Sequence, residues 1–369
     1  MVTFDLEALH KSIGARRVGL AVTPAAWLPQ RQAALTECPA VAGDVRAFLA
    51  LEHGLRGELQ DGVHVESYAD RATGLPVFSF YGERKTVPDA FWEAVDVAVF
   101  CAQDASHRAY TFHWALAELM ATAAVRGKAV VVLDRPSPLA WLGAAGPVAA
   151  QFFPLPFPML PALTHGELGL WLKQEQFPEL DLHVLPAQCW TRSMPWAATG
   201  LPWIPPSPNL PSPDSILAYA CTGILQATTV AEGRGTCRPF EFIGAPFIRP
   251  ETLAAALNAR KLPGVYFREI YFAPAFNKFA GQVCGGVHLM FDAAARPDPV
   301  RTQFVILQEL ARLYPQEFEL KPGFAVWLDN GAWTPERLRA LDILAYLESL
   351  RPVLAEFAAR THPARLYPE

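Results

Sequence analysis

The chain has 369 residues, of which 51% are apolar and 18% charged, and its 31 Lys and Arg residues against 36 Asp and Glu residues give a formal net charge of −5. This composition excludes an intrinsically disordered chain, and the lack of any basic tail or Lys/Arg block excludes nucleic acid as an expected partner. At about 150 residues per domain, the length predicts two domains.

The first half alternates short apolar runs with helical patterns. Buried strands are predicted at residues 17–22, 45–51, 75–80, 95–101, 129–133 and 182–185, and helices at 107–126 and 164–174. Because a helix separates the strands at 95–101 and 129–133, these two strands are expected to be parallel neighbours joined by a crossover. The pattern predicts an α/β fold, with a Rossmann-like, doubly wound parallel sheet in a domain over residues 1–195.

Residues 189–213 contain seven prolines and little periodicity, which is typical of a junction between domains. Beyond it, helices are predicted at 215–228, 250–261, 300–313 and 335–360, and strands at 265–271 and 287–291. Pro352 is expected to interrupt the last helix. The second half therefore predicts a smaller α+β domain over residues 196–369.

The N-terminus is acidic and no apolar segment follows it, so we expect no secretory signal and predict a soluble, cytoplasmic protein. The apolar stretch at 145–163 contains five prolines, which excludes a membrane-spanning helix there. The six cysteines include no C-x-x-C pair, so neither a zinc site nor a disulfide framework is predicted. The sequence does not indicate an oligomeric state.

Polar side chains follow the predicted strand at 45–51, at the sheet edge where open parallel sheets bind ligands. They include Glu52, His53 and Arg56. Glu52 is the leading candidate for a catalytic carboxylate, with a local ion pair to Arg56 as the alternative interpretation. The nearby glycines match neither G-x-G-x-x-G nor Walker-A spacing, so no nucleotide cofactor is predicted.

Two more strand ends carry comparable groups. Gln103, Asp104 and Arg108 follow the strand at 95–101, and Asp134 and Arg135 follow the strand at 129–133. Arg108 or Arg135 is a candidate for binding a ligand carboxylate through two hydrogen bonds. The alternative is an Asp–Arg pair that fixes the loop, above all between the adjacent Asp134 and Arg135.

The second half contributes Asn209 in a Pro-Ser-Pro-Asn loop, and Glu232 and Arg234 in a Glu-Gly-Arg-Gly segment. Glycines beside an arginine let backbone and guanidinium approach a ligand together, although a glycine-rich turn with a Glu–Arg pair is the alternative. Ser207 lacks a G-x-S-x-G elbow and Cys237 lacks a recognisable His partner. Carboxylates are therefore better catalytic candidates than a nucleophilic serine or cysteine.

Taken in order, these segments resemble the NamZ-type exo-β-N-acetylmuramidases over nearly the whole chain. The matching residues are 51–54 with 56–57, 73–77 with 81–82, 103–104 with 108 and 110–111, 132–136, 166–168, 206–209, and 232–236 with 239–241 and 244–246. That family hydrolyses the β-linkage of N-acetylmuramic acid at the non-reducing end of peptidoglycan fragments, in a cleft between two domains. The resemblance implies an exo-acting glycosidase for small peptidoglycan saccharides, needing no cofactor or metal and suited to recycling of wall fragments.

Glycoside hydrolysis needs an acid for the leaving oxygen and a second group that activates water or stabilises the oxocarbenium ion. The resemblance implies Glu52 as the acid, and Glu232 and Asp104 compete for the second role. The lactyl carboxylate of muramic acid is expected to bind a guanidinium, and the candidates are Arg56, Arg108 and Arg234. Other expected substrate-binding residues are His53, Gln103, Asp134, Arg135 and Asn209.

Some positions depart from the family pattern, which has an aspartate at Cys101, a glycine at Ser106, a His-Gly pair near Pro161 and Ala162, and Glu-Gly-Thr-Asn at residues 226–229. The missing carboxylates at Cys101 and Gln226 leave two alternatives open. One is a non-catalytic muropeptide-binding or sensing protein on the same scaffold. The other is a glycosidase for another amino-sugar or uronic-acid glycoside.

Overall fold

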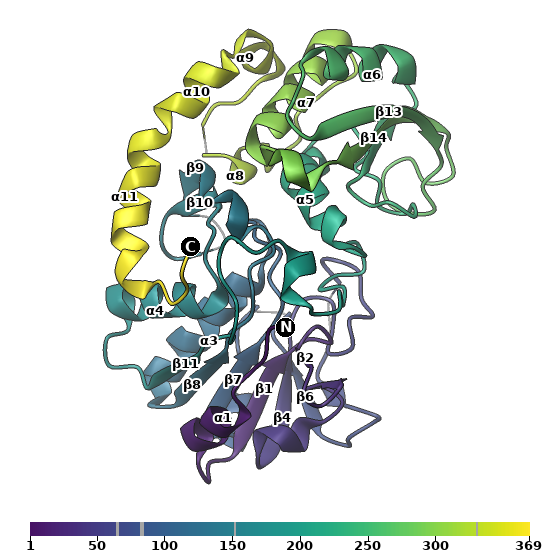
Figure 1. Cartoon of the computed structure of the whole chain (residues 1–369). Coiled ribbons are helices and arrows are strands. Elements are labelled where there is room, and N and C mark those ends of the chain that lie inside the picture. Colours follow the sequence, from purple (N-terminus) through teal and green to yellow (C-terminus); the bar gives the residue numbers. More distant parts are fainter. Residues whose placement is uncertain (64–65, 82–84, 151–152, 330) are drawn as a thin grey trace.

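The computed structural model describes residues 1–63, 66–81, 85–150, 153–329 and 331–369 (Figure 1). Gly82, which belongs to one of the matching segments, lies outside the described residues. Among the described helices, none is long and apolar enough to cross a membrane.

The first half is built on a seven-stranded sheet of order β11-β8-β7-β1-β4-β6-β5 (Figure 1). Every neighbouring pair is parallel except β5 and β6, which are antiparallel. The strands are β1 (Val18–Val22), β4 (Val45–Ala50), β5 (Tyr68–Ala69), β6 (Pro76–Ser79), β7 (Val97–Cys101), β8 (Ala129–Leu133) and β11 (Leu182–Leu185). Strands β4, β5 and β6 lie on one side of β1, and β7, β8 and β11 lie on the other, as in a doubly wound sheet. The predicted fold class is confirmed.

Both faces of this sheet are buried, which explains the continuous apolar runs in its strands. All residues of β1, β7 and β8 are buried, as expected for parallel strands covered on both sides. One face packs against α2 (Asp89–Ala94), α3 (Phe112–Arg126) and α4 (His165–Gln176). The other packs against α1 (Leu6–Ile13) and aromatic residues that include Trp190 and Trp196.

The helix predicted at 107–126 begins later, at Phe112. Residues before it form a turn, because Ser106 has a positive φ of 55° and the amide of Arg108 donates to the carbonyl of Met159 instead of forming a helical bond. The structure also contains elements that were not predicted: α1, α2, the hairpin of β9 (Ala145–Ala149) and β10 (Phe157–Leu160), and the short pair β2 (Trp27–Leu28) and β3 (Ala33–Ala34). Prolines inside β9 and β10 mask them as strands in the sequence.

The second half contains a three-stranded antiparallel sheet of order β12-β14-β13, with β12 at Phe242–Ala245, β13 at Val265–Phe272 and β14 at Cys284–Phe291. Helices α5 (Pro213–Thr222), α6 (Pro250–Ala259) and α7 (Pro299–Leu313) accompany it (Figure 1). The smaller α+β unit is confirmed, although β12 was not predicted. Gly286 explains the close contact between β12 and β14, because a Cβ there would lie 1.9 Å from the carbonyl oxygen of Ile243.

The C-terminal helical segment has two breaks, where one was predicted. It consists of α9 (Pro335–Ala340), α10 (Ile343–Ser349) and α11 (Arg351–Thr361). The break at Leu350 agrees with the effect expected of Pro352, which lies in the first turn of α11. The additional break follows from Asp342, whose side chain accepts the amide of Ala345 and starts α10 anew.

The C-terminal segment returns to the first sheet (Figure 1). Phe357 of α11 packs edge to face against Trp171 of α4, with ring centroids 5.6 Å apart. Further on, the hydroxyl of Tyr367 donates to Asp134 at 2.7 Å, and the amide of Leu366 donates to Glu167 at 2.9 Å. Residues near the C-terminus thus complete a buried polar cluster in the first half.

The buried guanidinium of Arg108 joins the two halves. It donates to the carbonyls of Pro147 (2.6 Å) and Phe157 (3.0 Å) in the β9–β10 hairpin. It also donates to the carbonyls of Trp327 (3.1 Å) and Leu328, at the end of α8 (Phe324–Trp327). Burial lowers its pKa to about 10, so the side chain remains charged at neutral pH.

Replacing Arg108 with methionine is expected to lower the free energy of unfolding by about 3 kcal/mol or more, because four carbonyls, three of them in buried contacts, lose their donor. Urea denaturation measures this loss. Arg46→Met is the matched control: Arg46 pairs with Asp44 at an exposed position and is expected to contribute about 1 kcal/mol or less. Equal losses in the two variants would show that Arg108 does not hold the halves together.

Candidate active site

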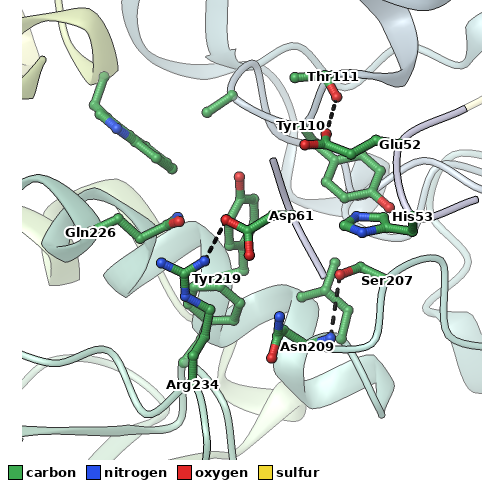
Figure 2. Close-up of a pocket in the computed structure, with 14 residues that line it drawn as sticks. Glu52, His53, Asp61, Tyr110, Thr111, Ser207, Asn209, Tyr219, Gln226 and Arg234 are labelled. Atoms are coloured by element: carbon green, nitrogen blue, oxygen red, sulfur yellow. Dashed lines mark hydrogen bonds and ion pairs between the residues drawn. The ribbon is translucent and has the colours of Figure 1, made fainter. Parts of the chain in front are cut away.

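A pocket of about 130 Å³ lies beyond the carboxyl end of β4, between loops of the two halves (Figure 2). Four of the predicted site residues line it: Glu52, His53, Asn209 and Arg234. The pocket wall also includes Asp61, Tyr110, Thr111, Ser207, Tyr219, Gln226, Phe240 and Trp327. The structure therefore brings together residues from the loop after β4, the segment before α3, the proline-rich junction and the second half.

A left-handed turn follows β4 and places Glu52 and His53 in the pocket. His53 has φ of 76° and Gly54 has φ of 79°, and the amide of Gly54 donates to the carbonyl of Leu51 at 3.1 Å. Positive φ is uncommon for a residue with a side chain and costs free energy, so this turn depends on the contacts around it.

The carboxylate of half-buried Glu52 accepts hydrogen bonds on both oxygens. The hydroxyls of Thr111 and Tyr81 (3.3 Å) contact Oε2, while the amide of Gly62 reaches Oε1 at 3.3 Å. Tyr81 also contacts Thr111, so the two hydroxyls form a chain that ends on Oε2. These contacts fix the orientation of the carboxyl group and leave Oε1 the less tightly held oxygen.

His53 is oriented by the carbonyl of Leu59, which lies 3.0 Å from Nδ1. Because a carbonyl only accepts, Nδ1 carries the proton and Nε2 keeps a lone pair. Burial lowers the pKa of His53, so the ring is neutral at neutral pH.

Arg234 lies between two carboxylates. Its Nη1 is 2.5 Å from Oδ2 of Asp61, and its Nε is 2.6 Å from Oε1 of Glu232 (Figure 2 shows the contact with Asp61). Glu232 is buried behind Arg234 and also accepts from Lys278 at 3.0 Å and Asn277 at 3.2 Å. Burial opposes the charge on Arg234, but Glu232 and Asp61 outweigh it and raise its pKa.

Asn209 connects the junction to the loop that carries Glu52. Its side-chain amide donates to Oε1 of Gln60 at 2.7 Å, and its backbone amide donates to Ser207 at 3.3 Å. Asn209 and Ser207 both line the pocket, and Figure 2 shows the contact between them as a dashed line. Side chains of the two halves thus contact each other at the pocket.

The other predicted site residues do not line this pocket: Arg56, Gln103, Asp104, Arg108, Asp134, Arg135 and Glu232. Arg56 pairs with Asp70 at 2.8 Å, not with Glu52 as the alternative interpretation expected. The local Glu232–Arg234 pair is present, and Arg234 reaches the pocket as well.

Asp134 and Arg135, although adjacent, do not pair with each other. Asp134 accepts from Thr164, from the amide of Gly166 and from Tyr367. Arg135 donates to Gln103 at 3.2 Å and to the carbonyl of Trp27 at 3.0 Å. Both side chains therefore stabilise buried loops of the first half.

Asp104 is buried beneath the strand ends. Its Oδ2 accepts the amide of Ser106 at 2.8 Å, whereas Oδ1 has no hydrogen-bond partner among the described residues and lies 3.8 Å from Nε2 of His165. Burial raises the pKa of Asp104 to about 7. This carboxyl group thus holds its proton at mildly acidic pH.

The positions that depart from the family pattern have clear structural settings. Ser106 and Ala162 have φ of 55° and 54°, the left-handed conformation that glycine adopts without cost. Cys101 is buried at the end of β7, and Gln226 lines the pocket. Only Gln226 among these four touches the candidate site.

The pocket residues that were not predicted as site residues include Asp61, Tyr219 and Trp327. Asp61 lies in the same polar loop as Glu52, and this position in the sequence could have identified it as a site residue. Tyr219 and Trp327 belong to apolar helical segments that look like core. Within the described ranges, no three His, Cys, Asp or Glu side chains come together as metal ligands.

Comparisons with known proteins agree over nearly the whole chain. A model for the N-terminal part of exo-beta-N-acetylmuramidase NamZ matches residues 18–214, and one for its C-terminal part matches residues 217–367. The peptidoglycan beta-N-acetylmuramidase NamZ of Bacillus subtilis (strain 168) is 37% identical over 332 residues, which cover 88% of this chain and 80% of that protein.

Two solved structures of DUF1343 family proteins from Bacteroides fragilis have the same fold, each with a TM-score of 0.79. One is 28% identical and covers 99% of both chains. The other is 21% identical, and the match covers 100% of this chain and 99% of that protein. At this level of identity it shows the fold alone. The family models and the curated relative together show that the chain belongs to the NamZ exo-beta-N-acetylmuramidase family.

Proposed function

We propose that this protein is an exo-acting glycoside hydrolase that releases N-acetylmuramic acid from the non-reducing end of peptidoglycan fragments. Family membership and the activity named for the Bacillus subtilis relative support the reaction class. The observation that carries the proposal is Glu52, a carboxyl group fixed by hydroxyl donors in a small pocket that also holds Arg234.

Glu52 acts as the general acid. A sugar alkoxide is a poor leaving group, so the bridging oxygen must gain a proton as the glycosidic bond breaks. Thr111 and Tyr81 hold Oε2, which leaves Oε1 to carry the proton and deliver it. The neutral His53 offers the lone pair of Nε2 to a sugar hydroxyl.

Arg234 binds the lactyl carboxylate of the sugar. Its guanidinium reaches the pocket, and carboxylates bind such a group through paired charge-assisted hydrogen bonds. Glu232 lies behind Arg234 and contacts its Nε, while Lys278 holds Glu232, so we propose that Glu232 positions Arg234. The wall formed by Tyr110, Tyr219 and Trp327 supplies apolar surface for the sugar ring.

A second candidate function is binding of the same saccharides without turnover. Gln226 favours it, because this residue lines the pocket where the family pattern has a glutamate, and an amide cannot transfer a proton. If the missing carboxylate is the second catalytic group, the protein binds muropeptides and releases no product.

Glu52→Gln keeps the shape of the side chain and removes its acid. We expect release of N-acetylmuramic acid from the disaccharide MurNAc-β-1,4-GlcNAc to fall at least about a hundredfold. Chromatographic assay of the free sugar measures this, with Glu58→Gln as control, since Glu58 lies in the same loop, contacts the amide of Arg56 and does not line the pocket. Undiminished turnover by Glu52→Gln would move the acid elsewhere, and binding without release by the wild type would favour the second function.

Asp104→Asn tests our proposal that Asp104 serves the fold and does not touch the substrate. An aspartate in the unfolded chain titrates near 3.8, whereas burial raises the pKa of Asp104 in the folded protein to about 7. Between these values the folded state binds the additional proton, so the contribution of Asp104 to stability falls as pH rises from about 4 to 7. Asparagine does not titrate, so the variant is expected to gain stability relative to the wild type over this range.

Urea denaturation at pH 5 and pH 8 measures the difference, alongside turnover of the disaccharide. Turnover of Asp104→Asn is expected to stay within a few-fold of the wild type. A loss as large as that of Glu52→Gln, in a variant that remains folded, would place Asp104 in the catalytic machinery instead.

A further inference from the structure

The loop after Glu52 crosses the pocket and contacts the second half through two consecutive residues. Gln60 accepts from Asn209 at 2.7 Å, and Asp61 accepts from Arg234 at 2.5 Å. In Figure 2 the carboxylate of Asp61 and the guanidinium of Arg234 face each other inside the pocket. The loop is also tied to the candidate acid, because the amide of Gly62 donates to Glu52.

The two carboxylates on Arg234 are held very differently. Glu232 is 1% exposed and is bound by Arg234, Lys278 and Asn277 together. The side chain of Asp61 is 45% exposed, and Arg234 is its one ion-pair partner among the described residues. Ion pairs open to solvent are weak, whereas removing one partner of a buried pair is costly. Asp61 is therefore the exchangeable partner of Arg234.

The charges of the site leave little room for another anion. Asp61 and Glu232 are two carboxylates, and the cations that pair with them, Arg234 and Lys278, balance their charge. Asp61 occupies Nη1 of Arg234, one of the two terminal nitrogens that a bidentate carboxylate ligand would use. An incoming carboxylate therefore finds Nη1 of Arg234 already bound, and it is repelled by the negative charge of Asp61.

We propose that Asp61 is an internal occupant of the anion subsite on Arg234, and that the carboxylate of the sugar displaces it on binding. The inference rests on the proposed function, since it takes the ligand to be a sugar acid of the muramic type. Asp61 then affects specificity. A ligand that bears a carboxylate breaks the Asp61–Arg234 pair and replaces it with its own ion pair to Arg234. A neutral sugar leaves the Asp61–Arg234 pair intact and gains nothing from it.

Asp61→Asn is expected to bind free N-acetylmuramic acid roughly two- to fivefold more tightly than the wild type, because the competing charge is gone. Binding of N-acetylglucosamine, which lacks the lactyl carboxylate, is expected to be unchanged. Isothermal titration calorimetry with both sugars measures this. Asp44→Asn is the matched control, since Asp44 is 48% exposed, pairs with Arg46 and lies at the opposite end of β4.

Unchanged or weaker binding of N-acetylmuramic acid by Asp61→Asn would overturn the inference, while leaving the proposed function intact if the wild type binds and turns over its substrate. If the wild type neither binds the acid nor releases it from the disaccharide, both proposals fail.

A crystal structure of the complex gives a second readout. We expect the sugar carboxylate on Arg234 and Asp61 turned away, and a complex with Asp61 still on Arg234 and the carboxylate elsewhere would refute displacement.

Discussion

The arrangement of the pocket depends on one buried cation. Arg108 is nearly inaccessible to solvent, and its hydrogen bonds go to carbonyls of the β9–β10 hairpin and of the turn at Trp327. A buried charge is tolerated only when its donors are satisfied, so the hairpin and the turn are held at fixed positions around it. Trp327 is itself part of the pocket wall, and Thr111, three residues after Arg108, contacts Glu52. The segment from Arg108 to Thr111 thus links the contact between the two halves to the carboxyl group of Glu52.

Much of the fold follows from local sequence patterns. The central strands are continuous apolar runs, and that pattern is specific to strands buried on both faces. The helices with clear periodicity were also found, whereas β9 and β10 were not, since their prolines argue against strands when only the local sequence is considered. Pro352 gave one break of the C-terminal helical segment, but the break before α10 depends on a side-chain cap at Asp342 that periodicity does not reveal.

The candidate site was predictable only in part, because the rule that polar groups follow strand ends does not say which way they turn. Glu52 and Arg234 reach the pocket, whereas Arg108 turns into the interface, toward carbonyls that lie 219 and 220 residues further along the chain. Asp134 similarly turns toward Tyr367. Such partners are brought together by the tertiary fold, and no local spacing encodes them. Tyr219 and Trp327 are identified as pocket residues only once both halves are in place.

The polar cluster at Asp134 also has a consequence for how the protein is made. Asp134 and Tyr367 are 233 residues apart, and Leu366 completes the hydrogen bonding of Glu167 across 199 residues. A ribosome delivers the sheet and α4 long before residues 366–367 emerge, and domains generally begin to fold in the order of synthesis. During that interval the nascent first half has an incomplete buried cluster next to β8. Its final packing therefore waits for translation of the C-terminal segment.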